Sequence, residues 1–117
     1  MSLKTFTIIG SGNVATHIGK ALQRGGYIIN GVFSHTLANA ELLAAALHCP
    51  ATDSIGDVPE ADAFLFSVKD SALPSLASEI VKRFGKTPTY IHTAGCIPVS
   101  IFGNGATRQA VIYPLQT

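Results

Sequence analysis

The sequence predicts a single α/β domain whose core is a doubly wound, mainly parallel β-sheet. Short runs rich in β-branched and aromatic residues alternate with runs of helical period along the chain, which is typical of consecutive strand–helix–strand units. The strand-like runs are almost continuously apolar, as expected where helices cover both faces of a sheet. With 117 residues, 47% of them hydrophobic and 13% charged, the chain can form one compact core.

The expected strands share a short apolar run that ends at glycine, proline or polar residues. They are residues 5–9, 27–33, 49–52, 63–68, 89–93 and 110–113. Residues 55–60 are expected to form a turn or a short helical piece, and residues 95–107 have no clear period. Right-handed crossovers between successive parallel strands would give the doubly wound order.

Three helices are expected between these strands. Residues 13–24 place Val14, Ile18 and Leu22 along one stripe and are followed by a glycine pair, which commonly ends a helix.

The second and third helices are expected from their composition and their first residues. Residues 37–47 are rich in Ala and Leu, with Thr36 as a suitable N-cap. The third helix, capped by Asp70 or Ser71, would extend to residue 84 with a proline in its first turn.

Charge, hydropathy and cysteine usage exclude several classes of function. The formal net charge is +1 and no run is rich in Lys or Arg, whereas nucleic-acid binding needs clustered basic charge. No apolar run approaches the length of a membrane span and the N-terminus has no signal-peptide pattern, so we expect a cytoplasmic protein without a membrane partner. Cys49 and Cys96 form no CxxC pair, and we expect both to be buried small hydrophobes.

A G-x-G-x-x-A motif at residues 10–15 lies between the first expected strand and the first expected helix. Gly10 permits the tight turn, Gly12 lets the backbone approach a pyrophosphate, and the small Ala15 lets helix and strand pack closely. The N–H groups of the first helical turn would face the anion. The motif predicts dinucleotide contacts at Gly10, Ser11, Gly12, Asn13 and Val14. The alternative is a glycine-rich turn without a ligand.

The end of the second strand carries the signal for cofactor choice. An NAD-preferring domain usually has an acid there, which binds the ribose 2′-hydroxyl, whereas this chain has Ser34, His35 and Thr36. The nearest acid, Glu41, is already inside the second helix. These three side chains can donate to a 2′-phosphate, and His35 can add partial positive charge. We therefore expect NADP rather than NAD. The alternative is ordinary helix capping by Thr36, with His35 in solvent.

Two further segments are expected at the same edge of the sheet, because ligands bind outside the carboxyl ends of parallel strands. Val68 would lie beneath the cofactor and Lys69 beside it, although a solvated surface lysine is an equally good interpretation. Thr93 and Gly95 would lie at the nicotinamide end.

His92 is the one candidate catalytic residue, since it could bind substrate or exchange protons at the end of the fifth strand. The alternative, a structural histidine bonded to a backbone carbonyl, is equally consistent with the sequence. His92 and Cys96 do not predict a metal site, because no further ligand follows with zinc spacing.

Five segments together carry a family resemblance that spans nearly the whole chain. They read IIGSGNVATHIGKAL, GVFSHT, FLFSVKDSALPSLASEI, YIHTAGCIPVSIF and VIYPLQT. The chain resembles NADP-dependent oxidoreductases with a Rossmann-like N-terminal domain, which are similar to pyrroline-5-carboxylate reductase and to the β-hydroxyacid and 6-phosphogluconate dehydrogenases.

The resemblance implies that residues 1–117 are the NAD(P)-binding Rossmann domain. In that group a helical C-terminal domain follows, which is absent here and usually supplies the dimer interface and part of the active site. A homo-oligomer is therefore expected of the full-length protein, and this chain alone is expected to be inactive. The resemblance implies cofactor contacts at residues 10–14 and 34–36, with residues 68–70 and 92–95 lining the cleft.

The leading hypothesis is an oxidoreductase that transfers hydride to or from a small imine, keto or hydroxy acid substrate. A non-catalytic dinucleotide-sensing or regulatory module is the alternative. A third hypothesis, a methyltransferase-like domain that binds S-adenosylmethionine, normally requires an acid after the second strand, which this chain lacks.

Overall fold

The computed structural model describes residues 4–93 and 108–111 of the chain. Six parallel strands form one sheet in the order β3-β2-β1-β4-β5-β6. They are β1 (Thr5–Ile9), β2 (Ile28–Phe33), β3 (Ala51–Thr52), β4 (Ala63–Phe66), β5 (Thr89–His92) and β6 (Arg108–Val111). This order, in which the chain reverses direction across the sheet after β3, confirms the predicted doubly wound α/β fold.

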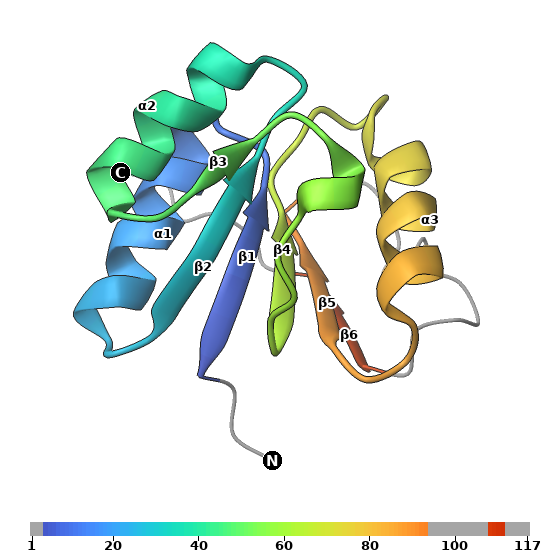
Figure 1. Cartoon of the computed structure of the whole chain (residues 1–117). Helices are drawn as coiled ribbons and strands as arrows, with labels where there is room; N and C mark the ends of the chain where they lie inside the picture. Colours follow the sequence, from blue (N-terminus) through green and yellow to red (C-terminus); the bar gives the residue numbers. More distant parts are fainter. Residues whose placement is uncertain (1–3, 94–107, 112–117) are drawn as a thin grey trace.

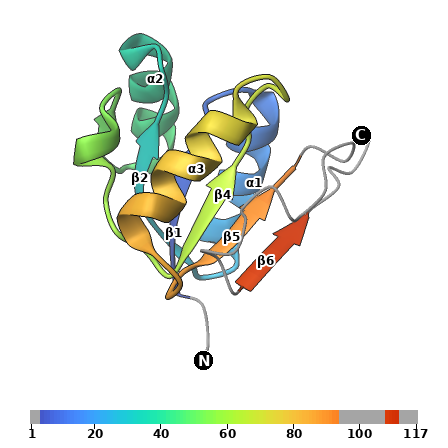
Figure 2. The same ribbon diagram turned by 90° about the vertical axis from the view of Figure 1, so that its right-hand side faces the viewer.

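Helices cover both faces of the sheet. Helices α1 (Asn13–Arg24) and α2 (Leu37–Leu47) lie together on one face, and α3 (Leu73–Phe84) lies on the other (Figure 1). The view along the sheet shows α3 in front of β1, β4 and β5, with α1 behind them (Figure 2). Each face has its own buried apolar cluster, as strands with two covered faces require.

Small residues bring α1 close to the sheet. The expected stripe of Val14, Ile18 and Leu22 is only half-buried, whereas Ala15 and Gly19 are buried. A Cβ added at Gly19 would lie 2.8 Å from Cδ1 of Leu47 on α2, closer than van der Waals contact allows. Ala15, the third small residue of the glycine motif, is fully buried in the apolar cluster of this face, as close packing of helix and strand requires.

On the opposite face, aromatic side chains fill the space beneath α3. The ring of Phe64 stacks on that of Tyr90 with centroids 5.9 Å apart, and both side chains are fully buried. The Tyr90 hydroxyl donates a hydrogen bond of 2.6 Å to the carbonyl of Gly85. Burial raises the pKa of Tyr90 to about 12, because the charged phenolate would lose its hydration.

At the amino edge of the sheet, the carboxylate of Asp62 connects the segment before β4 to the start of β1. Asp62 accepts hydrogen bonds from the backbone N–H groups of Lys4 and Thr5 at 2.9 and 3.1 Å. The N–H of Asp62 donates in turn to the Thr5 hydroxyl at 2.9 Å. The two backbone donors hold the pKa of Asp62 below its usual range, since both stabilise the charged form.

Helices α1 and α2 have the predicted bounds, but the predicted cap of α3 is wrong. Helix α3 begins after Ala72, because the carbonyl of Lys69 accepts the N–H groups of Ala72 and Leu73 at 2.9 and 3.1 Å. This turn includes Asp70 and Ser71, so neither residue caps the helix. Thr36 does occupy the N-cap position of α2, but its side chain makes no capping hydrogen bond.

Strand ends differ from expectation by one or two residues. β2 begins at Ile28, β3 includes only Ala51–Thr52, β4 ends at Phe66 and β5 ends at His92. The sixth strand, β6, begins earlier than predicted. Residues 95–107, for which no period was found, lie outside the described residues.

Candidate functional site

The carboxyl ends of the central strands meet at one edge of the sheet. The N–H of Gly10 donates to the carbonyl of Phe33 at 2.7 Å, and the N–H of Ser67 donates to that of Ile9 at 2.8 Å. The N–H of Thr93 donates to the carbonyl of Phe66 at 3.2 Å. These bonds extend the pairing beyond the strands and hold the loops after β1, β2, β4 and β5 side by side.

Gly10 makes the first turn possible. Its φ of +124° is a conformation that L side chains rarely adopt, and an added Cβ would overlap the backbone carbonyl of Ser67. The same Cβ would lie 3.2 Å from Cγ1 of Val68, so Val68 packs directly against the glycine loop. The structure thus brings together the predicted residues on β1 and after β4.

Gly12, at the start of α1, faces open space. A Cβ added there would meet no heavy atom within 4 Å. No side chain caps this end of α1, and its first turn contains no acid. Thr16 donates to the Gly12 carbonyl through both its N–H, at 3.0 Å, and its hydroxyl, at 3.1 Å.

These features of the glycine loop suit a bound anion. The backbone N–H groups and dipole at the start of α1 favour negative charge, and the room beside Gly12 allows close approach. The residues present therefore fit a dinucleotide pyrophosphate.

Hydroxyl groups meet at the end of β2. The Ser34 Oγ accepts a hydrogen bond from the Ser11 hydroxyl at 3.2 Å and another from the Thr36 N–H at 3.3 Å. The hydroxyl proton of Ser34 is thereby left to donate elsewhere, since an oxygen that accepts twice has no further lone pair. His35 and Thr36 are exposed, and the His35 ring makes an edge contact with Phe33. This end of β2 thus combines the Ser34 hydroxyl, which is bonded to the glycine loop, with the exposed side chains of His35 and Thr36.

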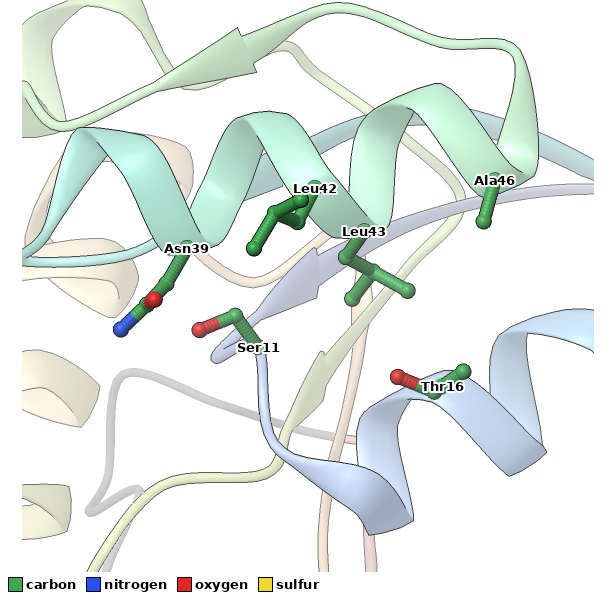
Figure 3. A pocket seen from close by; sticks show the side chains of 6 residues that line it. All are labelled: Ser11, Thr16, Asn39, Leu42, Leu43 and Ala46. Atoms are coloured by element: carbon green, nitrogen blue, oxygen red, sulfur yellow. The ribbon is translucent and has the colours of Figure 1, made fainter.

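A pocket of about 150 Å³ lies beside these hydroxyls, between α1 and α2. Its lining comes from the glycine loop and the facing sides of the two helices: Ser11, Thr16, Asn39, Leu42, Leu43 and Ala46. Figure 3 shows the side chains of Asn39 and Ser11 at the same end of this pocket. Asn39 was missed from the sequence. Asn39 lies one helical turn after Thr36, and this spacing could have indicated from the sequence that both residues share one side of α2.

The loop after β4 holds two more predicted residues. Val68 is half-buried against Gly10, whereas Lys69 and Asp70 are exposed. The carbonyl of Lys69 belongs to the turn before α3. A cofactor contact by the Lys69 side chain stays a prediction.

The end of β5 is more enclosed. The side chain of His92 is fully buried and has a partner within the protein. The Thr93 hydroxyl donates to the carbonyl of Phe66 at 3.4 Å. Gly95 lies outside the described residues. The catalytic role of His92 stays a prediction.

Residues 4–93 and 108–111 contain no cluster of three or more His, Cys, Asp or Glu side chains that could hold a metal ion. No helix among them has the length and apolar character needed to cross a membrane.

The arrangement of a glycine loop, an open helix start and a doubly wound sheet agrees with a family match over nearly all of the sequence. The family described as the Rossmann-like domain matches residues 2–116. The chain belongs to this family of Rossmann-like domains. No curated protein matches the sequence significantly.

Solved structures contain the same fold within longer chains. The Bacteroides fragilis protein BF3122, named as a candidate NADP oxidoreductase, is 35% identical with a TM-score of 0.89. The match covers 97% of this Rossmann-like domain and 45% of that chain. Protein TM1727 from Thermotoga maritima is 18% identical with a TM-score of 0.71, and the match covers 92% of this chain and 39% of that one.

Prephenate dehydrogenase from A. aeolicus, solved in complex with hydroxyphenyl propionate and NAD+, is 17% identical with a TM-score of 0.73. That match covers 91% of this chain and 41% of the dehydrogenase. The two more distant likenesses concern the fold alone. This Rossmann-like domain spans less than half the length of each of the three proteins.

Proposed function

We propose that this Rossmann-like domain binds NADP(H) and is the cofactor domain of an oxidoreductase. The observation that carries the proposal is the open start of α1 at Gly12, next to the hydroxyl pair of Ser11 and Ser34. The name of BF3122 as a candidate NADP oxidoreductase supports the same function.

In this proposal the pyrophosphate lies against the glycine loop. The backbone at Gly10, Ser11 and Gly12 and the first helical residues, Asn13 and Val14, would hold it. No carboxylate in the first turn of α1 opposes a bound anion. Val68 supports the loop from the side of β4.

The preference for NADP over NAD rests on the donors at the end of β2. Ser34 is left with a proton to donate, and His35 and Thr36 are exposed beside it. A ribose 2′-phosphate accepts hydrogen bonds and carries negative charge, so donors without a neighbouring acid favour it. The first turn of α2 contains no acid.

When bound, the nicotinamide would supply or accept a hydride, with a small imine, keto or hydroxy acid as the substrate class. The chain's own contribution is to bind and orient the cofactor. Lys69, Thr93 and Gly95 would border its nicotinamide half. His92 is proposed as a proton-exchanging residue, although its burial means that a neighbouring segment would have to move for substrate to reach it.

That burial favours a second candidate function. A domain whose one candidate catalytic side chain is fully enclosed suits a dinucleotide-sensing or regulatory module without chemistry of its own. A turnover assay separates the two functions. NADPH consumption with a panel of imine and keto-acid substrates, by a protein that joins this domain to a substrate domain, would support the oxidoreductase. Binding without consumption would support the sensor.

The proposal extends to the assembly and location of the protein. Because the domain covers only 45% of BF3122, we propose that a helical C-terminal domain completes the cleft and forms a homo-oligomer. Cys49 is a free, half-buried thiol whose pKa is raised by burial, which is consistent with the reducing cytoplasm.

A thermal-shift comparison of NADPH, NADH and S-adenosylmethionine tests the proposed function directly. A ligand at about 100 times its dissociation constant stabilises the folded state by roughly 2.7 kcal/mol. We expect the largest rise in melting temperature with NADPH. If saturating NADPH and NADH leave the melting temperature unchanged, the dinucleotide proposal is wrong, and a shift with S-adenosylmethionine alone would favour the methyltransferase-like alternative.

A further inference from the structure

The side chain of Thr16 makes a hydrogen bond that adds little to the helix in which it lies. The Thr16 N–H donates to the carbonyl of Gly12 at 3.0 Å, as the first backbone bond of α1, and the Thr16 hydroxyl donates to the same oxygen at 3.1 Å. Threonine hydroxyls that bond the carbonyl four residues earlier tend to weaken a helix slightly. The stability of α1 therefore does not explain this second bond.

The two bonds hold the peptide unit that joins Gly12 to Asn13. A peptide unit is planar, so a carbonyl held at one end fixes the direction of the N–H at the other. The Asn13 N–H lies at the uncapped start of α1 and has no acceptor in the described part of the chain. It points out of the helix start, where a Cβ added at Gly12 would meet no heavy atom within 4 Å. This N–H can therefore donate to a ligand.

The second bond also changes the strength of that donor. A hydrogen bond accepted by a carbonyl draws electrons toward its oxygen and makes the N–H of the same peptide unit a stronger donor, by about 10–30% per bond. The first turn of α1 contains no acid, so no charge in that turn opposes an anion in front of the Asn13 N–H.

We propose that Thr16 is a positioning residue for the dinucleotide pyrophosphate. Its hydroxyl holds and polarises the peptide unit between Gly12 and Asn13, and the N–H of that unit donates to a phosphate oxygen. Thr16 itself does not touch the ligand. The proposal rests on the function proposed above. NADP and NAD share the same pyrophosphate, so the effect of Thr16 should be equal for both cofactors.

The test is calorimetric titration of NADPH and NADH into the unmodified chain, Thr16→Val and Thr16→Ser. Valine has the shape of threonine without the hydroxyl, and Leu43 and Ala46 line the same pocket as Thr16, so an added methyl group has apolar neighbours. In Thr16→Val we expect both affinities to fall by the same factor, about two- to fourfold. Thr16→Ser, which keeps the hydroxyl, should retain both affinities. Cooperative thermal unfolding establishes that each free variant is folded.

Nuclear magnetic resonance follows the same peptide unit without any ligand. The resonance of the Asn13 amide nitrogen should move upfield in Thr16→Val and in Thr16→Ala, because the preceding carbonyl then accepts one hydrogen bond fewer. Thr16→Ser should leave this resonance close to its original position. An Asn13 resonance that is the same in all four proteins would contradict the proposed polarisation.

Ser75→Ala provides the matched control. The Ser75 hydroxyl donates to the carbonyl of Ala72 at 3.4 Å, at the start of α3 on the opposite face of the sheet. This bond is of the same kind but belongs to a helix for which no pyrophosphate contact is proposed. Both affinities of Ser75→Ala should therefore equal those of the unmodified chain.

The outcomes are distinct. Unchanged affinities in Thr16→Val, or an equal loss in Thr16→Ser, would overturn the role of the hydroxyl and leave the proposed function intact. A loss for NADPH alone would also overturn it, because the effect would then concern the 2′-phosphate. If the unmodified chain binds neither cofactor, the proposed function fails, and the role of Thr16 fails with it.

Discussion

The two edges of the sheet use their polar groups differently. At the amino edge, the Asp62 carboxylate and N–H are bonded to Lys4 and Thr5, so these polar groups satisfy one another and connect β1 to β4. At the carboxyl edge, Gly12 faces open space at an uncapped helix start, and Ser34 keeps a proton to donate. The polar groups described here at the amino edge are hydrogen-bonded to one another, whereas donors at the carboxyl edge can still bind another molecule.

This difference agrees with the proposed position of the cofactor. Polar groups normally find partners within the protein or in water, so the donors at the carboxyl edge can bind the cofactor proposed above. The contrast also separates the residues that should affect stability from those that should affect binding. Gly10 and Asp62 belong to the first group, and Gly12 and Ser34 to the second.

The largest effect on stability is expected for Gly10→Ala. The new Cβ would overlap the backbone carbonyl of Ser67, at a φ of +124° that alanine rarely adopts. Backbone strain and overpacking each cost about 1–3 kcal/mol, so we expect a loss of about 3 kcal/mol in the free energy of unfolding. Urea denaturation measures it.

Gly12→Ala is the matched control for that substitution. Its backbone is extended with φ −78° and its Cβ would enter open space, so only the weaker N-cap preference of alanine should count, at about 1 kcal/mol. Equal stability of the two variants would contradict the close approach of the loop to Ser67.

Cofactor choice should respond strongly to Ser34→Asp. The substitution removes the hydroxyl donor that remains after Ser34 accepts from Ser11 and Thr36 and adds a like charge near the 2′-phosphate. Hydrogen bonds to charged groups contribute about 1.5–3 kcal/mol, so NADPH affinity should fall roughly 10- to 100-fold. NADH affinity should stay equal or rise. Fluorescence titration of both cofactors measures the ratio, and parallel losses would remove the basis for naming NADP.

The smallest effect is expected at the amino edge. The pKa of Asp62 is lowered by the N–H donors of Lys4 and Thr5, so its ionised form stabilises the folded state. That contribution is fully present above the unfolded value of 3.8 and is lost as the pH falls through the lower folded pKa. Asp62→Asn should thus be less stable than the unmodified chain at neutral pH, with the difference closing in acid. A constant difference across the titration would argue against the carboxylate's role, and cofactor affinity at neutral pH should not change.

The sequence predicted the structure correctly where a strong local pattern determines the element. The helix at Asn13–Arg24 has the bounds expected from its period and from the glycine motif, and Gly10 has a positive φ that suits the expected tight turn. The doubly wound parallel sheet was expected from the alternating elements and right-handed crossovers, and the structure confirms it.

The sequence predictions were less accurate where tertiary contacts determine the bounds of an element or the surroundings of a side chain. The start of α3 depends on hydrogen bonds to the Lys69 carbonyl, which compete with any cap at Asp70. Asn39 could not be distinguished from an ordinary surface residue, since its place beside Ser11 exists only once α1 and α2 pack together.

Calorimetric titration of NADPH into the unmodified chain and into Gly12→Val tests the central claim most directly. The valine side chain would enter the open space beside the start of α1, where the pyrophosphate is proposed to lie. We expect saturable binding of about one NADPH per unmodified chain, none by Gly12→Val, and cooperative thermal unfolding of both free proteins, which establishes that each is folded. Equal NADPH binding by both proteins, or none by the unmodified chain, would contradict a dinucleotide site at this glycine loop.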